Sequence, residues 1–486
     1  MNNYQSTIGL EIHVELKTRS KMFCGCVNNP DEKNPNTNVC PVCLAHPGVL
    51  PVINKKAVES VLKLGLALDS EIPQISKFDR KNYFYPDLPK GYQISQYDQP
   101  LVVGGKLNDV KLTRIHLEED TGRLIHSSQL ADYPQNEIAA SLIDFNRAGV
   151  PLMELVTEPD IKSGDQAVTF AKELQMILRY LDISNANMEK GEMRVEANIS
   201  VSACDELGTK VEIKNLNSFK VLGDSINYEI KRQIEVLEKG DEVHHETRGW
   251  NDNKKITVSQ RIKEKAHDYR YFSEPDLPPM DIKEFDLEKL KLEIPELPEQ
   301  KRKRFISEFG LKSEQVEIFI EDYNLADYFE KAISELLAET NTIDTALKIQ
   351  LLFNYLTSDI KGLMNELGGD FNTLKITPPK FALLVALIVN KKLPSRLAKD
   401  ILKEMFESGL EPEQIMNEKG LSQISDQDII KKTIQEIIAE NPVALEDYKK
   451  GKQNASQFLI GQAMKKLKGQ ANPDILKKLL EEYLSK

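Results

Sequence analysis

The stretch Thr7–Leu16, with the sequence TIGLEIHVEL, constrains the fold more than any other part of the chain. Apolar residues occupy every even position from 8 to 16, whereas Glu11, His13 and Glu15 occupy odd positions. Strict alternation of this kind is typical of a β-strand that is buried on one face. We therefore expect the chain to fold around this strand.

The polar face of this strand has two interpretations. Side chains on one face of a strand lie roughly 6.5–7 Å apart, so Glu11 and His13 could point into one pocket from one rigid element. A carboxylate beside an imidazole suits a divalent metal ion or acid–base chemistry. The alternative is a half-buried strand whose polar face is simply solvated.

Length and charge limit the class of protein. The 486 residues exceed what one core usually supports, so two to four domains are expected. A net charge of −12 argues against a general nucleic-acid binder, because phosphate contacts need positive potential. RNA contact would need a local basic patch, and residues 441–486, with nine lysines against five acidic residues, could provide one. The alternative there is a solvated helix face.

No apolar run is long enough to span a membrane, and no leader pattern opens the chain, so we expect a cytoplasmic location without membrane contact.

Four of the five cysteines lie close together in sequence, as Cys24-Gly-Cys26 and Cys40-Pro-Val-Cys43. Two short-spaced pairs joined by a loop rich in Asn and Pro are typical of a zinc knuckle. The alternative is a set of reduced thiols that are merely close together. Because no fifth group nearby suggests an open coordination position, we expect a structural zinc ion.

Two later stretches carry further candidate residues. Thr113–Asp120, TRIHLEED, reads as a strand on which Arg114, His116 and Glu118 share one face and Glu119 falls on the other. Glu154 interrupts an apolar strand, LMELV, where a carboxylate is costly unless a cation or hydrogen-bond donors accompany it. After about Glu299 the alternation ends and the pattern is helical, which indicates a domain boundary.

Several long motifs follow one another along nearly the whole chain: IGLEIHVEL (8–16), KFDRKNYFYPD (77–87), HLEEDTG (116–122), DFNRAGVPLME (144–154), EIKNLNSF (212–219), DYRYFSEPD (268–276) and GQAMKKLKGQANP (461–473). In this combination the chain resembles the B subunit of the bacterial aspartyl/glutamyl-tRNA(Asn/Gln) amidotransferase. The sequence departs from the family at Ser273, where proline is usual.

The resemblance implies a ligase that forms carbon–nitrogen bonds with glutamine as the amide-nitrogen donor (EC 6.3.5.-). In that family the B subunit uses ATP and Mg²⁺ to phosphorylate the side-chain carboxylate of Glu-tRNA(Gln), Asp-tRNA(Asn) or both. Ammonia from a glutaminase A subunit then displaces the phosphate, and a small C subunit clamps A to B. The implied fold is α+β: a mixed-sheet cradle domain with helices (1–293), an all-helical domain (294–405) and a small helical tail domain that contacts tRNA (406–486).

Carried over motif by motif, the resemblance assigns catalysis and Mg²⁺ binding to Glu11, His13, Glu119 and Glu154. The alternation argument alone selects Glu118 instead of Glu119, so both remain candidates. The phosphate-binding pattern G-x-x-x-x-G-K-[ST] is absent, so ATP would be held mainly through the metal and through basic side chains such as Lys81 and Arg147.

Two alternatives remain at this point. The archaeal relative specific for tRNA(Gln) carries an inserted domain, for which this chain has no room. A zinc-dependent RNA-binding or scaffold protein would lack catalysis, and the carboxylates placed within strands argue against it. The sequence does not distinguish Glu-tRNA(Gln) from Asp-tRNA(Asn) as the substrate.

Overall fold

The computed structural model describes residues 4–126, 140–262, 269–339, 345–371, 373–419, 427–449, 453–467 and 473–484. The chain divides into two compact units, Met1–Gln300 and Lys301–Lys486. The first contains sheets and helices and the second is helical in its described residues, which confirms the α+β class. The further division at residue 406 stays a prediction. Within the lysine-rich segment, residues 450–452, 468–472 and 485–486 lie outside the described part.

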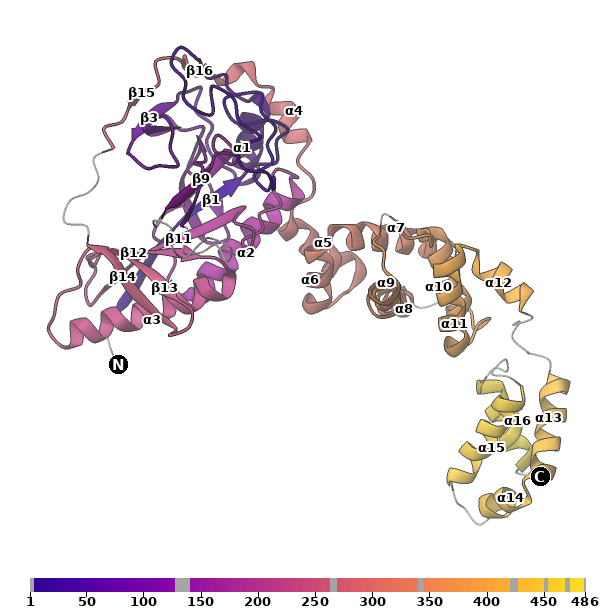
Figure 1. Cartoon of the computed structure of the whole chain (residues 1–486). Helices are drawn as coiled ribbons and strands as arrows, with labels where there is room; N and C mark the ends of the chain where they lie inside the picture. The colour runs from indigo at the N-terminus through magenta and orange to yellow at the C-terminus, as the bar shows by residue number, and fades with distance from the viewer. Residues whose placement is uncertain are drawn as a thin grey trace. The chain divides into compact units, whose positions relative to one another are not determined.

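A nine-stranded sheet forms the centre of the first unit (Figure 1). β1 lies between β10 and β11 and pairs antiparallel with both, whereas β12 and β13 pair in parallel, so the sheet is mixed. β6 (Lys106–Leu107) pairs with β7 at the edge. The other strands follow in the order β14 (Ile256–Ile262), β13 (Glu246–Asn251), β12 (Val211–Leu216), β11 (Met193–Ser202), β1 (Gln5–Glu15), β10 (Pro151–Thr157), β7 (Val110–Glu119) and β5 (Val102–Val103).

The two faces of β1 differ as the alternation predicts. The apolar residues at even positions 8–14 are at most 1% exposed. They belong to one hydrophobic cluster with residues of α1 (Lys55–Ala67), α2 (Gly164–Tyr180) and α3 (Phe219–Glu238). Helices therefore cover this face of the sheet, and the face that carries Glu11 and His13 is left for a site.

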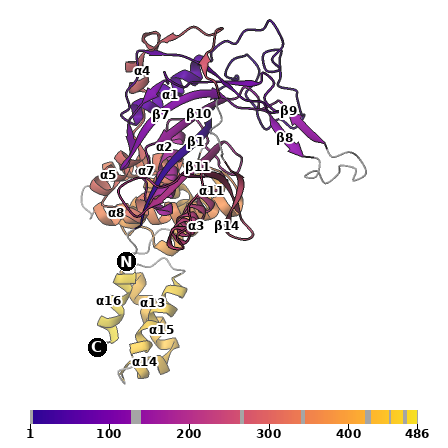
Figure 2. The ribbon, with the colours of Figure 1, turned by 90° about the vertical axis from the view of Figure 1, so that its left-hand side faces the viewer.

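Small sheets complete the first unit. β15 (Phe272–Ser273), β3 (Asp79–Asn82) and β4 (Tyr92–Ser95) form a three-stranded sheet. β2 (Ile75–Ser76) pairs with β16 (Met280–Asp281), and a 3₁₀ turn, Ile282–Glu284, and α4 (Leu287–Leu292) follow. β8 (Arg123–His126) and β9 (Ser141–Asp144) pair and project from this unit (Figure 2).

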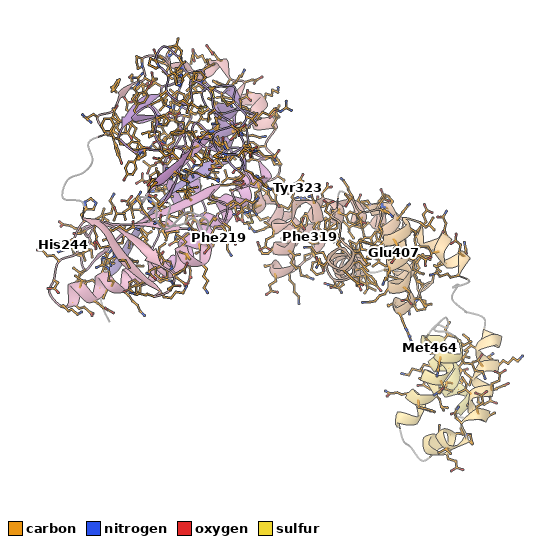
Figure 3. The ribbon with its side chains drawn as sticks, viewed as in Figure 1. Phe219, His244, Phe319, Tyr323, Glu407 and Met464 are labelled. Carbon is orange, nitrogen blue, oxygen red and sulfur yellow. The ribbon has the colours of Figure 1, made fainter. Side chains whose placement is uncertain are left out.

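The second unit begins with helices that share an aromatic core. Phe319 on α6, labelled in Figure 3, lies with its ring centroid 5.5 Å from that of Phe305 and 4.4 Å from that of Phe329. The helices are α5 (Pro298–Phe309), α6 (Ser313–Glu321), α7 (Tyr323–Glu339), α8 (Thr345–Asn354), a π-helical turn (Tyr355–Ile360), α9 (Lys361–Leu367), α10 (Pro378–Val389), α11 (Ser395–Ser408) and α12 (Pro412–Glu418).

The last helices of the second unit have a hydrophobic cluster of their own, which includes Ile430, Leu459 and Leu476. These helices are α13 (Gln427–Glu440), α14 (Pro442–Lys449), α15 (Gln453–Lys466) and α16 (Pro473–Leu484). Across the described residues of both units, no helix combines the length and apolar character needed to span a membrane.

Candidate functional site

Three neighbouring strands place polar side chains in one row on the open face of the large sheet. His13 on β1 pairs in register with Glu154 on β10, and Glu154 pairs with His116 on β7. Glu11 and Glu118 project from the same face, each two residues along its strand. All five line a cavity of about 470 Å³. The site is thus built on rigid strands and opens into a pocket large enough for a substrate group.

The imidazole of His13 lies among three carboxylates. Its Nε2 is 3.3 Å from Glu154 Oε2, 3.5 Å from Glu118 Oε1 and 3.9 Å from Glu11 Oε1. Glu118 and Glu154 are 2% and 5% exposed. Buried carboxylates this close together repel one another unless positive charge lies among them. A divalent cation would supply that charge.

Charges within the cluster shift its pKa values. Burial lowers the pKa of His13, but hydrogen bonds to Glu118 and Glu154 outweigh it and raise the pKa to about 10. Burial also opposes ionisation of the two glutamates. Even so, Lys81 lowers the pKa of Glu118, and His116 and His13, which both hydrogen-bond to Glu154, hold the pKa of Glu154 well below its usual range. Burial and the neighbouring Glu154 raise the pKa of Glu11. The ionised Glu118 and Glu154 therefore flank a proton on His13 that a metal ion could replace.

The donor set fits a hard divalent ion. One ligand atom from each of Glu11, His13 and Glu154 lies within 4.8 Å of the others, and His116, Glu118 and Glu154 form a second such group. Carboxylate oxygens with at most one or two imidazole nitrogens suit Mg²⁺ or Mn²⁺. The two groups share Glu154.

The structure does not bring Glu119 to this cluster. Lys90 Nζ lies 2.8 Å from its carboxylate, and the backbone N–H of Ile94 donates to Glu119 Oε1 at 3.0 Å. Adjacent residues on a strand point to opposite faces, so Glu118 and Glu119 cannot share the cavity face of β7. Glu118, the residue selected by the alternation, occupies the position for which the resemblance offered Glu119.

The two basic candidates are placed differently. Lys81 lines the cavity, 4.0 Å from Glu118 Oε2, with its Nζ 5.2 Å from the ring centroid of Tyr269. Arg147 is not among the lining residues. Its guanidinium donates to the backbone carbonyls of Thr121 and Gly122 at 3.0 and 2.9 Å. Lys81 is thus available to a ligand in the cavity, whereas Arg147 holds the loop that follows β7.

Sequence reasoning left several lining residues out of the site. Arg114 and His116 share a face with Glu118, and that alternation was a sufficient signal to include them. The alternating charged face of β11 allows either solvation or lining of this same cavity, and its Arg194 does line the cavity and donates to Asp120 Oδ2 at 2.7 Å. Tyr269 and Tyr271 also line the cavity, although no local pattern connects them with β1.

The four clustered cysteines meet as the spacing predicts. Cys43 Sγ lies 3.6 Å from Cys24 Sγ and 3.8 Å from the sulfurs of Cys40 and Cys26. Four sulfurs placed tetrahedrally at about 2.3 Å from zinc would be about 3.8 Å apart, so the arrangement fits this ion. A hydrogen bond from Cys24, together with the charge of Lys21, lowers the pKa of Cys43 to about 4, which favours a thiolate ligand.

Comparison with known proteins gives consistent matches. Residues 6–288 match the family model of the GatB/GatE catalytic domain, and residues 327–484 match that of the GatB domain. Three similar proteins are B subunits of aspartyl/glutamyl-tRNA(Asn/Gln) amidotransferases. The one from Thermoanaerobacter sp. (strain X514) is 46% identical over 99% of this chain and 100% of its own. The one from Carboxydothermus hydrogenoformans is 44% identical over 100% of this chain and 100% of its own. The one from Dehalococcoides mccartyi is 45% identical over 100% of this chain and 99% of its own.

Proposed function

Because the chain belongs to the family of aspartyl/glutamyl-tRNA(Asn/Gln) amidotransferase B subunits, we propose that it activates a tRNA-bound side-chain carboxylate with ATP and converts it to an amide. The substrate is Glu-tRNA(Gln), Asp-tRNA(Asn) or both. The chain acts in the cytoplasm with a glutaminase A subunit, which supplies ammonia, and a small C subunit.

Activation is needed because a carboxylate is a poor acyl donor to ammonia. A side-chain carboxylate oxygen attacks the γ-phosphorus of ATP, the bond to the bridging oxygen breaks, and ADP leaves. The nitrogen of ammonia then attacks the acyl carbon, and inorganic phosphate leaves with the electron pair of the broken carbon–oxygen bond. Phosphoryl transfer depends mainly on positioning and on neutralising charge.

The cavity residues suit this chemistry. Glu11, His13, Glu118 and Glu154 would hold Mg²⁺, which would neutralise phosphate charge when bound. Lys81 adds a positive charge within the same cavity, and its pKa is raised because Glu118 and Glu154 outweigh the opposing effect of burial. Lys81 therefore stays cationic and can bind a phosphate or the substrate carboxylate.

Two other regions have supporting roles in this proposal. The cysteine quartet, Cys24, Cys26, Cys40 and Cys43, binds a structural zinc ion, because four sulfurs leave no open position. The tail domain, residues 406–486, contacts the tRNA. Lys466 is paired with Glu436 and Glu440, so exposed lysines such as Lys465 are better candidates for phosphate contacts.

The proposal rests on one observation. A single cavity contains a row of His13, Glu154 and His116, which is flanked by Glu11 and Glu118. The proposal is tested with the complex reconstituted from the full chain and its A and C subunits. ADP release should require the aminoacylated tRNA. When glutamine is withheld, ADP should still be released although no amide forms. ADP release that is independent of aminoacylated tRNA would contradict the proposal. Parallel assays with Glu-tRNA(Gln) and Asp-tRNA(Asn) identify the substrate.

A further inference from the structure

His116 is buried against the metal-site candidates, and its two ring nitrogens have different neighbours. The residue is 2% exposed. Its Nδ1 accepts a hydrogen bond from Arg114 Nε at 3.3 Å, and its Nε2 lies 3.4 Å from Glu154 Oε2. The cluster thus contains two histidines, His13 and His116, and the geometry distinguishes their roles.

Arg114 determines the tautomer of His116. A guanidinium has N–H donors and no acceptor, so the nitrogen that faces it must present a lone pair. The proton of the neutral ring then lies on Nε2, which donates it to Glu154. A histidine that ligates a metal needs the opposite arrangement, with a lone pair toward the ion and the other N–H on an acceptor. His116 is therefore set up as a donor to Glu154.

His13 has a different environment. Its Nε2 faces the carboxylates of Glu11, Glu118 and Glu154 within 3.9 Å, so a cation in their midst can take the place of the Nε2 proton. Beside one divalent cation on Glu11, His13, Glu118 and Glu154, the site proposed above, we propose that His116 is a positioning residue that fixes the Glu154 carboxylate, and that Arg114 fixes the tautomer of His116. This inference rests on the proposed metal site and adds the roles of Arg114 and His116.

The proposal excludes a second cation on His116, Glu118 and Glu154, although these residues also cluster. It makes a chemical prediction about the replacement of His116. A glutamine at this position offers a carbonyl oxygen to Arg114 and an N–H to Glu154, so it can reproduce both hydrogen bonds. A leucine fills similar space and offers neither.

The test measures Mn²⁺ binding to the full chain by the EPR signal of the free ion. Wild type should bind one equivalent in this site, and H116Q should keep its affinity within about threefold. H116L should bind Mn²⁺ with about 10- to 100-fold lower affinity, as expected when a group that orients a metal ligand is removed. R114M should also weaken binding, and the effects of R114M and H116L should be less than additive in the double variant, because Arg114 acts in part through His116, besides the direct approach of its Nη2 to Glu154 Oε1 at 3.9 Å.

The outcomes separate this inference from the proposed function. Wild type that binds no Mn²⁺ in the cavity, or H13Q with unchanged affinity, would contradict the metal site and the inference together. A second Mn²⁺ equivalent that H116Q removes would contradict the inference alone, as would H116L with wild-type affinity or additive effects of R114M and H116L.

Discussion

The two candidate metal sites of the first unit are built in opposite ways. The cysteine cluster comes from residues 24–43, and its four sulfurs surround one position. The carboxylate–histidine cluster comes from β1, β7 and β10 and faces a cavity of about 470 Å³. A closed site of thiolates stabilises loops, whereas an open site of oxygen ligands on rigid strands leaves room for a substrate. The difference predicts that substitutions in the cysteine cluster mainly lower stability, whereas substitutions in the carboxylate–histidine cluster mainly lower the rate of the reaction.

The largest effect is expected from E11Q in the open site. The substitution keeps the shape of the side chain and removes a charge that would hold the cation. ADP release that depends on aminoacylated tRNA should fall about 100-fold or more, because metal-assisted phosphoryl transfer is worth several kcal/mol. E189Q, in an exposed turn, is the control and should stay within twofold of wild type. If E11Q released ADP at the wild-type rate, β1 would have only a structural role.

C40S should act on the closed site. We expect loss of one zinc equivalent and a fall in the free energy of unfolding of about 3 kcal/mol or more, because loss of a structural metal is among the strongest single-residue effects. ADP release per folded chain should change less than tenfold. C204S replaces the exposed fifth cysteine and should alter neither quantity. Wild-type zinc content in C40S, measured by elemental analysis, would contradict the assignment.

The pH dependence of Mn²⁺ binding tests whether His13 gives up a proton when it becomes a metal ligand. Without metal, hydrogen bonds to Glu118 and Glu154 raise its pKa to about 10 against the effect of burial, so the proton must leave when the ion binds. Affinity should therefore increase with pH between about 7 and 9, by up to about tenfold per unit. H13Q should bind weakly and show little pH dependence. A flat profile for wild type would contradict the role of His13.

The smallest effect concerns Glu15, on the same strand face but away from the cluster. Burial and the neighbouring Asp120 raise its pKa from 4.5 to about 8. Between these values the folded chain holds a proton that the unfolded chain lacks, so stability falls as pH rises through this window. E15Q should melt about 2 °C higher than wild type at pH 9, a difference on the order of 1 kcal/mol, and equally at about pH 4, below both pKa values. Equal melting temperatures at pH 9 would contradict the shift.

The local parts of the site could be predicted from the sequence. Alternation on β1 correctly placed Glu11 and His13 on one face, and close spacing correctly brought Cys24 and Cys26 together with Cys40 and Cys43. Alternation on β7 also separated Glu118 from Glu119. These features depend on the geometry of a single strand or a short loop, which sequence periodicity reports directly.

The remaining features depend on contacts between distant segments. The row that joins Glu154 to His13 and His116 is set by the register of β10 against two strands, and register is not encoded in any one strand. Tyr269 reaches the cavity from a segment about 250 residues after β1 in sequence. Arg147 is held by the carbonyls of Thr121 and Gly122, a contact that residue type alone does not predict.

The central claim is that residues on the cavity face of the sheet hold the catalytic cation, and that their neighbours in sequence, which point to the opposite face, do not. Glu118 and Glu119 test it most directly, because they are adjacent, chemically identical and buried on opposite faces of β7. Mn²⁺ titration of E118Q and E119Q, with the free ion measured by EPR, should show a loss of about tenfold or more for E118Q and near wild-type affinity for E119Q. Loss of Mn²⁺ binding in E119Q with retention in E118Q would contradict the account.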